Sequence, residues 1–512
     1  MLNNLEVDPL FVLDLANNHF GDMDHAMRIV EEFSNLAAEV KMQIAIKFQY
    51  RDLDTFIHPD FKHRRDVKYI ERFLSTELRH EQLLELADFV RNRQLILMTT
   101  PFDEKSVDLA IEAKVDIIKI ASASCDDYPL LSSITKAGKP IIASTAGAKI
   151  GAIDRLVSIL ESSNQDFALM HCVAIYPTPN DHLNLRQINL FRDRYPNVPI
   201  GWSTHENPND FEIIRLAAAC GARIFERHVG IGTARYPQND YSSTPDQIRA
   251  WINAFKSAAN SLGAYERLPA TDLETKTLRS LKRAMFAKSS LSKGQPITKS
   301  DVVYAIPSSD NQLLANTDIE TSIVRVEKEP LAPLYADDLE VQESNRKQEI
   351  DNILFQIRGL LSESRTAINN DAVFELSHHY GFEKFREFGA TLITCINREY
   401  AKKILVQLPR QKHPYHFHKV KEETFQLLWG DVEMTVNGKK IKMSPGDTCL
   451  VKPGEWHKFQ TLNGAVIEEI STTYTVSDSC YEDTKIANLD PKTRKTKIDN
   501  WQPVFGFIKK LI

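Results

Sequence analysis

The sequence predicts an α/β protein that contains a (β/α)8 (TIM) barrel, a small second module and an all-β barrel. Over residues 1 to about 260, eight short apolar runs alternate with segments of helical period, the pattern of βα units on a parallel sheet. From about residue 390 the pattern changes to short alternating strands with Gly and Pro turns. The 512 residues also exceed what one hydrophobic core usually serves. We therefore expect domains at residues 1–270, 276–342 and 350–512.

The eight apolar runs are the predicted strands of the first barrel. They occupy residues 11–16, 45–50, 95–100, 117–122, 140–145, 167–172, 199–205 and 223–228. Segments between them, such as residues 81–93 and 212–221, are amphipathic, and the second ends in Gly221, which suits a helix C-terminus. The active site of such a barrel lies at the carboxyl ends of its strands, so the polar residues at those ends are the candidates for chemistry.

Polar side chains follow every run at that end. A lone lysine in a strand can instead extend outward into solvent, and a lone histidine is often a hydrogen-bonded core residue. Their recurrence at the same end of nearly every run predicts one shared mouth. In chain order they are Asp14, Asn18, His19, Lys47, Gln49, Thr100, Lys119, Ser122, Ser144, Thr145, His171, Tyr176, Ser203, His205, Glu226 and His228.

This set of side chains suits an anionic substrate and a metal. Ammonium groups neutralise charge and hydroxyls donate directional hydrogen bonds, so a phosphate and a carboxylate fit Lys47, Lys119, Thr100, Ser122, Ser144 and Ser203. His205 and His228, at the ends of neighbouring strands, could hold one divalent metal with open positions for water and substrate. Their spacing is not a metal signature by itself, so this prediction depends on the barrel.

The barrel region resembles the sialic acid (N-acetylneuraminate) synthase family, which condenses phosphoenolpyruvate with an aldose to a 2-keto sugar acid. The matching stretches are LDLANNHFG, IKFQ, TTPFD, IKIAS, IIASTAG, LMHCVAIYPTP, IGWSTHE and FERHVGI followed by NDYSS. The resemblance implies that His205 and His228 bind Mn²⁺ or Mg²⁺. It implies a phosphoenolpyruvate site at Lys47, Thr100, Lys119, Ser122, Ser144 and Ser203. It also puts Asp14, Asn18, Gln49, Tyr176, Glu226 and Asp240 in the substrate and catalytic region.

The residues also suggest how the reaction would proceed. Glu226 or Asp240 would orient or deprotonate a water molecule beside the metal held by His205 and His228. For Arg227, between these groups in the eighth run, we expect the opposite side of the strand and pairing with helix carboxylates.

The chain departs from the family pattern at three positions. Asp14 stands where the family usually has a glutamate, and Ala174 replaces a common asparagine. Residues 277–307 resemble the family's antifreeze-like (SAF) domain, which reaches across a homodimer to the partner's active site, so a swapped homodimer is expected. Ile306 stands where an arginine contacts the sugar's N-acetyl group. We expect an aldose that lacks this contact or is held differently.

The last third carries the cupin signature. HPYHFHKVKEETFQLLWG and PGEWH contain the patterns HxHx4Ex6G and PGxxH, and three histidines with one carboxylate suit Zn²⁺, Mn²⁺, Fe²⁺ or Ni²⁺. The predicted ligands are His416, His418, Glu423 and His457. The region loosely resembles cupins that isomerise sugars, which implies that it interconverts a ketose and the barrel's aldose. Sugar binding without catalysis and a role in oligomerisation are the alternatives.

Composition narrows the function classes for the whole chain. The net charge of -6 and the absence of a long basic run argue against nucleic acid or an anionic membrane as partner. No secretory pattern or membrane-length apolar run is present, so the cytoplasm is expected, with the six cysteines reduced. Two alternatives to a synthase remain: a pyruvate-dependent Schiff-base aldolase using Lys47 or Lys119, and a non-catalytic sugar-sensing or scaffold protein.

Overall fold

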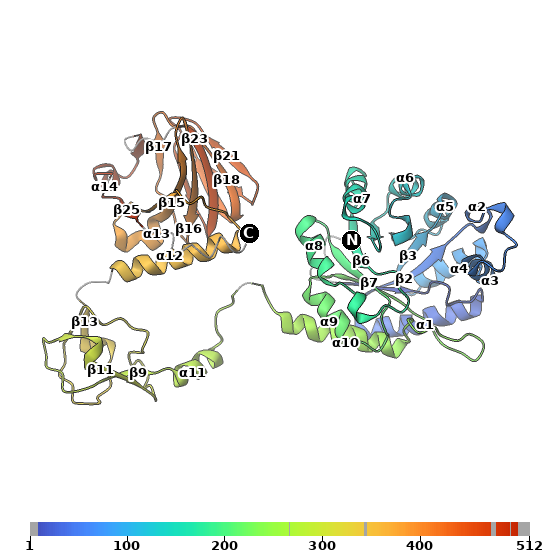
Figure 1. Cartoon of the computed structure of the whole chain (residues 1–512), viewed down its shortest axis with the longest axis horizontal. Coiled ribbons are helices and arrows are strands. Elements are labelled where there is room, and N and C mark those ends of the chain that lie inside the picture. Colours follow the sequence, from blue (N-terminus) through green and yellow to red (C-terminus); the bar gives the residue numbers. More distant parts are fainter. Residues whose placement is uncertain (1–8, 266, 342–345, 473–477, 492, 500–512) are drawn as a thin grey trace. The chain divides into compact units, whose positions relative to one another are not determined.

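The computed structural model describes residues 9–265, 267–341, 346–472, 478–491 and 493–499. The chain forms two compact units, Met1–Leu268 and Pro269–Ile512 (Figure 1). All six cysteines are free thiols, three of them buried and three partly buried. None of the helices in the described ranges is long and apolar enough to cross a membrane.

The first unit is the predicted (β/α)8 barrel. Eight parallel strands pair in chain order, and the last pairs with the first, which closes the barrel. Each strand coincides with one of the eight predicted runs. The strands are β1 (Leu10–Asp14), β2 (Gln43–Tyr50), β3 (Ile96–Pro101), β4 (Ile117–Ile120), β5 (Ile141–Ser144), β6 (Phe167–Cys172), β7 (Ile200–Thr204) and β8 (Ile224–His228).

Helices surround these strands and begin at residues suited to capping. Asp22 and Asp103 accept hydrogen bonds from the first turns of α1 and α5, and Thr244 forms a capping box on α10. Gly221, just past α9, has the left-handed φ of 95° expected of a C-terminal glycine. The helices are α1 (Met23–Val40), α2 (Leu53–Phe56), α3 (Lys68–Ser75), α4 (His80–Arg91), α5 (Glu104–Glu112), α6 (Tyr128–Lys136), α7 (Ile150–Ser162), α8 (Arg186–Arg194), α9 (Glu212–Ala219) and α10 (Pro245–Leu262).

The interior of the barrel changes from apolar to polar along the strands. Alternate residues of a strand point to the same side, so Leu10, Val12 and Asp14 line the interior in succession. Leu10 and Val12 belong to a small apolar cluster inside the barrel, to which the other strands contribute Ala45, Met98, Ile117, Ile142, Ala168, Met170 and Ile224. The next inward position on several strands is polar. A polar layer therefore lies directly above the apolar cluster inside the barrel, at the carboxyl ends of the strands.

The second unit begins with α11 (Asp272–Leu281) and a small β module. Its core packs Met285, Leu291, Ile297 and Leu334. In the stretch SKGQPITKSDV, Gly294 has a left-handed φ of 87° and residues Lys299–Asp301 form one 3-10 turn. The antifreeze-like assignment stays a prediction. The strands are β9 (Ala284–Ala287), β10 (Pro296–Ile297), β11 (Val302–Ala305), β12 (Ser322–Val324) and β13 (Leu339–Val341).

The remainder of this unit is a cupin-like sandwich preceded by α12 (Arg346–Glu363). Its two antiparallel sheets have the orders β21-β18-β23-β16-β15-β14-β25 and β20-β19-β22-β17-β24. β14 already joins the large sheet, so the antiparallel layout begins before residue 390, where its alternating pattern first becomes clear in the sequence. The elements are β14 (Val373–His378), α13 (Phe385–Phe388), β15 (Gly389–Asn397), β16 (Tyr400–Gln407), β17 (His416–His418), β18 (Glu423–Gly430), β19 (Val432–Val436), β20 (Lys439–Met443), β21 (Thr448–Val451), β22 (His457–Gln460), β23 (Ala465–Thr472), β24 (Ser479–Tyr481), α14 (Thr484–Ala487) and β25 (Lys495–Ile498).

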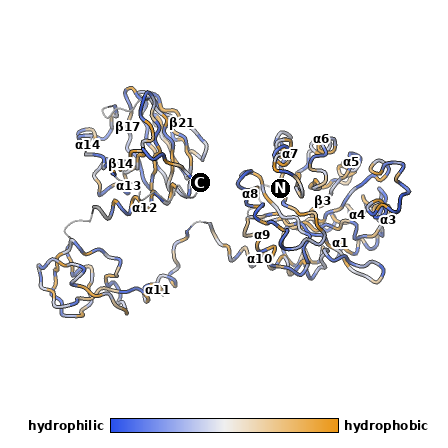
Figure 2. The backbone as a smooth tube through the Cα atoms, viewed as in Figure 1, coloured by the Kyte–Doolittle hydropathy of each residue, from blue (hydrophilic) through white to orange (hydrophobic). Residues whose placement is uncertain are grey.

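Two apolar layers stabilise the sandwich. Leu405, Phe425, Met434 and Phe459 pack together, joining strands of both sheets. Ile353 and Ile357 of α12 pack with residues of the large sheet in a second cluster. Figure 2 shows hydrophilic and hydrophobic stretches alternating along α12 and along the helices of the barrel. One face of each such helix is therefore available for burial.

Candidate functional site

A buried cluster of charges lies at the carboxyl end of the first barrel. Lys47 Nζ lies 2.9 Å from Asp14 Oδ2 and 2.8 Å from Glu226 Oε1. Ser203 donates a hydrogen bond to the same Glu226 oxygen at 3.3 Å. The other oxygen, Glu226 Oε2, is buried and has no hydrogen-bond partner among the described residues. Four strands, β1, β2, β7 and β8, thus bring predicted site residues into direct contact.

Opposite charges keep this cluster ionised although it is buried. Burial raises the pKa of Asp14, but the charge and the hydrogen bond of Lys47 are the main effects that outweigh burial and bring this pKa to about 2. Burial also raises the pKa of Glu226, and Lys119 and Lys47 reverse that effect, so this pKa is lowered. Burial lowers the pKa of Lys47, but Asp14 and Glu226 outweigh burial and raise it. Lys47 is therefore an ammonium group balanced by two carboxylates.

His205 and His228 lie side by side next to this cluster, with ring centroids 5.3 Å apart. His205 Nδ1 lies 3.0 Å from the carbonyl oxygen of Val173, and a carbonyl can only accept, so Nδ1 carries the hydrogen and Nε2 has a lone pair. His228 Nε2 lies 3.6 Å from Asp14 Oδ2. Burial lowers the pKa of both rings, that of His205 to about 3. Neutral imidazoles are the form that binds divalent metals.

Lys119 supplies a second cation at the mouth. Its Nζ contacts Ser144 Oγ on the next strand and lies 3.1 Å from the carbonyl oxygen of Ile120. Burial lowers its pKa, and no carboxylate in the described ranges forms an ion pair with it. Ser122 accepts a hydrogen bond from the Ala146 N–H at 3.0 Å. The hydroxyl of Thr100 is buried without a described partner.

Other predicted residues lie at the rim. Gln49 donates to Asp14 Oδ2 at 3.2 Å, and the half-exposed Tyr176 has its ring 4.2 Å from that of His205. Asn18 donates to Val229 O and to Ser242 Oγ at 2.8 and 2.9 Å, so it ties loops together. Asp240 lies in the loop after β8 with an exposed side chain.

Three polar residues at strand ends make local bonds instead. His171 Nε2 lies 2.8 Å from Leu183 O, and Thr145 donates to Met170 O at 3.0 Å. His19 Nδ1 accepts from the N–H of Gly21 at 3.1 Å. For these three, the structural explanation is the simpler one.

The expected partner of Arg227 was wrong, although the expected side of the strand was right. The guanidinium packs over Trp251 of α10 and donates to Glu206 at 2.7 Å, and both charged side chains are fully buried. Glu206 follows β7 in a loop, not in a helix. The loop reaches the outer face of β8 because it begins at the neighbouring strand.

Sequence reasoning missed Arg51 and Tyr241 near the mouth. Arg51 stacks on Phe102 at 3.8 Å and donates to Gln49 at 2.9 Å, and burial lowers its pKa to about 10. The ring of Tyr241 lies 5.4 Å from that of His228. A cation directly after the second run could have signalled Arg51, whereas Tyr241 lies in a loop with no regular pattern.

The second candidate site is the histidine cluster of the cupin. Ligand atoms of His416, His418 and His457 all lie within 4.8 Å of one another, and all three residues are buried. Glu423 Oε2 lies 3.1 Å from His457 Nε2 and 3.4 Å from His418 Nε2. The predicted set of four therefore converges, from β17, β18 and β22.

Hydrogen bonds fix the orientation of these rings. Nδ1 of His416 lies 3.1 Å from Pro414 O, and Nδ1 of His457 lies 3.2 Å from Glu455 O. Carbonyls only accept, so in both rings Nδ1 is protonated and Nε2 carries a lone pair. Burial lowers the pKa of His416 well below its usual value. Nε2 of His457 and Oε2 of Glu423 are buried without a hydrogen bond to any described group.

A series of charged side chains extends from this histidine cluster into the wall of the cupin sandwich. Lys421 contacts Glu423 and lies 3.2 Å from Glu469 Oε1, while Lys403 lies 2.9 Å from the same oxygen. Burial raises the pKa of Glu469, but Lys403 and Lys421 outweigh burial, so this pKa is lowered. Both carboxylates are thus ionised and matched by lysines.

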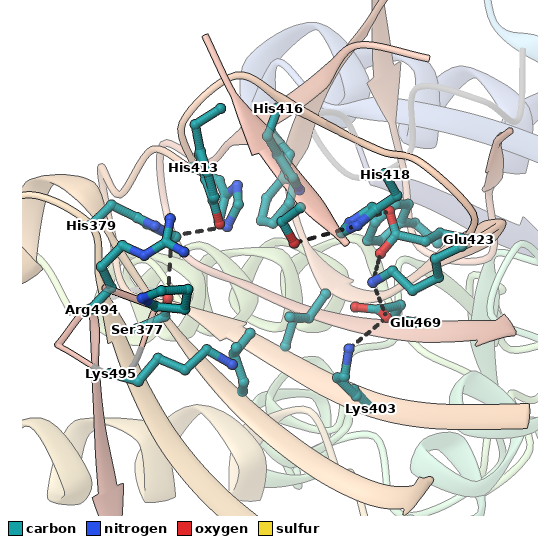
Figure 3. A pocket seen from close by; sticks show the side chains of 18 residues that line it. Ser377, His379, Lys403, His413, His416, His418, Glu423, Glu469, Arg494 and Lys495 are labelled. Atoms are coloured by element: carbon teal, nitrogen blue, oxygen red, sulfur yellow. Dashed lines mark hydrogen bonds and ion pairs between the residues drawn. The ribbon is translucent and has the colours of Figure 1, made fainter. Parts of the chain in front are cut away.

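These side chains line a cavity of about 70 Å³. Figure 3 shows His416, His418 and Glu423 along one part of the wall, with His379, Arg494, Ser377 and Lys495 along another. That second group was missed by sequence reasoning, because it comes from β14, the turn after β14, β25 and the turn before β25, which lie outside the signature stretches. Only the fold brings them to the histidines.

Both sites fit a divalent metal. In the cupin the fit is the convergence of His416 and His457 lone pairs with the unpartnered Glu423 oxygen. In the first barrel, the basis for the fit is the pair of neutral imidazoles of His205 and His228 beside the ionised carboxylate of Asp14.

Comparison with known proteins gives independent matches for both regions. Residues 35–267 match the NeuB family, and residues 404–466 match the cupin domain family. The spore coat polysaccharide biosynthesis protein SpsE of Bacillus subtilis is 28% identical over 58% of this chain and 84% of its own. Human N-acetylneuraminate-9-phosphate synthase is 25% identical over 50% of this chain and 72% of its own.

A solved structure is more similar still. It is described as a candidate spore coat polysaccharide biosynthesis protein E from Chromobacterium violaceum. This structure is 42% identical, covers 65% of this chain and all of its own, and superposes with a TM-score of 0.62.

Proposed function

Because the chain belongs to the NeuB family and also carries a C-terminal cupin domain, we propose that its barrel condenses phosphoenolpyruvate with an aldose. The products would be a 2-keto-3-deoxy sugar acid and phosphate. One relative is an N-acetylneuraminate-9-phosphate synthase, which is consistent with this chemistry. The single observation that carries the proposal is the contact of Lys47 with Asp14 and Glu226 beside His205 and His228.

The anionic substrate would lie against Lys119. This lysine has no described carboxylate partner, and Ser144 and Thr100 supply hydroxyls, one in contact with it and one unpartnered. Ser122 and Ser203 complete the proposed set. Lys47 is already balanced by two carboxylates, so we assign to it the orientation of Glu226 as well as long-range attraction for the anion.

Carbon–carbon bond formation would join the methylene carbon of phosphoenolpyruvate to the aldehyde carbon. A divalent cation held by His205 and His228 would polarise the aldehyde oxygen. Water then adds to C2, phosphate leaves with its C–O bond electrons, and C2 becomes the ketone. Glu226 would accept the proton of that water through Oε2, the oxygen that is buried without a partner. Asp240, in the loop after β8, remains a second candidate for this role.

The synthase proposal is tested by phosphate release. The purified chain is incubated with phosphoenolpyruvate, Mn²⁺ and a panel of aldoses. Lys119→Met should lower the rate roughly 100-fold because it removes a buried charge from the phosphate site. Lys136→Met, at an exposed position on α6, is the matched control. No phosphate release with any aldose would refute the proposal and favour a non-catalytic protein.

A Schiff-base aldolase is the second candidate, and the observation that favours it is the burial of Lys119, which lowers the pKa of its amine below the usual value. A lysine must be neutral to attack a carbonyl, and burial favours the neutral amine. Lys47 does not qualify, because its carboxylates raise its pKa. Borohydride treatment with pyruvate would attach a stable adduct to Lys119 if this mechanism operates, and mass spectrometry would find none if it does not.

The sugar and the assembly are finer parts of the same proposal. Ile306 is exposed, and Asp14 is held by Lys47 and Gln49. We propose an aldose held without the usual N-acetyl contact, in a homodimer with exchanged antifreeze-like domains. N-acetylmannosamine should then be used no better than unmodified hexoses or pentoses, and efficient use of it alone would contradict this. Analytical ultracentrifugation would test the dimer.

For the cupin we propose sugar binding at the histidine cluster, with isomerisation as the catalytic form of that function. Glu469 and Glu423 lie in the cavity wall as candidate bases for proton exchange between C1 and C2. Incubation of the full chain with Mn²⁺ and candidate sugars in deuterated water tests this by NMR. Label uptake at C2 would support isomerisation, and its absence with measurable binding would leave a binding role.

A further inference from the structure

The cupin cavity contains a guanidinium group whose charge is not balanced by any described carboxylate. Arg494 is 8% exposed and lines the cavity. Its Nη1 atom is buried and has no hydrogen-bond partner in the part of the chain that the structure describes. Figure 3 shows Arg494 in the cavity wall next to His379. A buried N–H without an acceptor is unfavourable, so the group is suited to a ligand that supplies one.

The carboxylates of the cavity are not available to Arg494. Glu423 is held by Lys421, and Glu469 Oε1 lies 2.9 Å from Lys403 and 3.2 Å from Lys421. Glu375, on β14, lies 3.1 Å from Lys495. Each of these three acids is therefore matched by a lysine, and the charge of the guanidinium is available to a ligand that enters the cavity.

One aromatic ring connects Arg494 to the histidine cluster. The guanidinium carbon lies 4.8 Å from the centroid of the Tyr481 ring, and the same ring stacks on His416 at 5.3 Å. This cation–π contact orients the plane of the guanidinium group and leaves its N–H groups available to bind a ligand. The cavity of about 70 Å³ therefore has metal-binding atoms at one part of its wall. The Arg494 guanidinium, which can bind an anion, lies on the other side of the Tyr481 ring.

We propose that the cupin cavity binds a sugar acid, with its carboxylate on Arg494 and its hydroxyl or carbonyl oxygens toward His416, His418 and His457. A planar guanidinium matches a carboxylate through two parallel hydrogen bonds. This inference rests on the proposed sugar-binding role of the cupin and specifies its substrate class. An aldose has no carboxylate, whereas the product of the proposed condensation does, so the cupin would act on the product side of the barrel reaction.

The binding test uses the full chain loaded with Mn²⁺ and three probes that share the glucose ring and differ at C6: D-glucuronate, D-glucose and D-glucose 6-phosphate. Isothermal titration calorimetry should give the lowest Kd for D-glucuronate. The phosphate sugar distinguishes a carboxylate site from a general anion site. D-glucose or D-glucose 6-phosphate binding as tightly as D-glucuronate would overturn the proposal without any variant. The Mn²⁺ electron paramagnetic resonance spectrum should also change on adding D-glucuronate.

Variants separate this site from the basic mouth of the first barrel. Arg494→Gln should raise the Kd for D-glucuronate roughly 10-fold or more, because a hydrogen-bonded charge is lost. Arg494→Lys should have a Kd between those of the parent and Arg494→Gln. Arg410→Gln, at an exposed position of the same domain, should have the same Kd as the parent. Circular dichroism and metal content check that each variant is folded and loaded. A folded Arg494→Gln protein with the parent Kd would overturn the proposal.

The outcome is independent of the synthase assay. If D-glucuronate binding depends on Arg494 but no aldose releases phosphate, the condensation proposal fails and the sugar-acid site stands. If phosphate is released but D-glucuronate binds no better than D-glucose, the condensation stands and the sugar-acid site fails.

Discussion

Glu226 divides two tasks between its two oxygens. Oε1 accepts from Lys47 at 2.8 Å and from Ser203 at 3.3 Å, which fixes the carboxylate. Oε2 makes no hydrogen bond within the described ranges although it is buried. An ionised oxygen held in this way is ready to receive a proton from a ligand or water without first breaking a bond to the protein.

Glu226→Gln should abolish this base while keeping the shape of the side chain. Phosphate release should fall by about 10²-fold to 10⁴-fold, the range for losing general base catalysis. Steady-state kinetics with phosphoenolpyruvate would measure the effect, with Glu161→Gln on the exposed surface of α7 as control. An unchanged kcat would exclude Glu226 and shift attention to Asp240.

Arg227 and Glu206 form an ion pair with both side chains fully buried, 2.7 Å apart. Arg227→Met should destabilise the barrel by about 3 kcal/mol, because Glu206 would be left as a buried charge. Calorimetric melting of the full chain would record this as a lower midpoint of the barrel transition. Arg194→Met, which breaks the exposed pair with Asp154, should shift the midpoint much less.

The double variant Arg227→Met/Glu206→Met separates charge from packing. Removing both ions should restore most of the lost stability, since an apolar pair needs no compensation. A double variant as unstable as Arg227→Met alone would contradict this explanation.

The place of a residue at the barrel mouth could be predicted from the sequence, but its partner could not. Asp14 stands near the end of the first apolar run, and that position correctly put it at the carboxyl end of β1. The pairing of Lys47 with both Asp14 and Glu226 depends on how barrel closure brings three strands together. The Glu206 partner of Arg227 depends on the path of a loop, for which the sequence has no periodic signal.

At the scale of elements, apolar runs predicted every strand of the first barrel because these strands are buried on both faces. The cupin was harder. β25 (KTKI) lies at the edge of the large sheet and is mostly polar, and β14 lies before the signature motifs. These two strands bring Ser377 and Lys495 to the cavity, and Arg494 directly precedes β25, so the missed strands explain the missed part of the site.

Gly201 of β7 is required by close packing between neighbouring strands. A Cβ atom there would lie 2.7 Å from Ile224 O and 2.8 Å from Ile224 Cβ. Gly201→Ala should therefore destabilise the barrel by about 1–3 kcal/mol through overpacking. Thermal melting would measure it.

Gly151 of α7 provides the matched control, since a Cβ there would meet nothing within 4 Å. Gly151→Ala should stabilise the helix by roughly 0.5–1 kcal/mol, because alanine restricts the unfolded chain and favours helix. Equal destabilisation by both substitutions would show that general intolerance of the barrel, not the Ile224 contact, is responsible.

At the scale of the whole molecule, the chain carries one candidate metal site in each of its two compact units. The full chain should bind two divalent cations. His416→Ala/His418→Ala and His205→Ala/His228→Ala should each lose one equivalent, measured by elemental analysis after dialysis, while His58→Ala at the exposed surface should lose none. A variant pair that removes both cations together would contradict independent sites.

Closure of the first barrel joins its earliest strand to its latest, since Asp14 pairs in register with His228. During translation, the residues around Asp14 leave the ribosome long before their neighbours exist, and domains generally complete folding as units. A stalled or truncated product that lacks the eighth strand therefore has no assembled mouth at all. Such a product lacks the contacts that join Asp14 and Lys47 to Glu226 and His228.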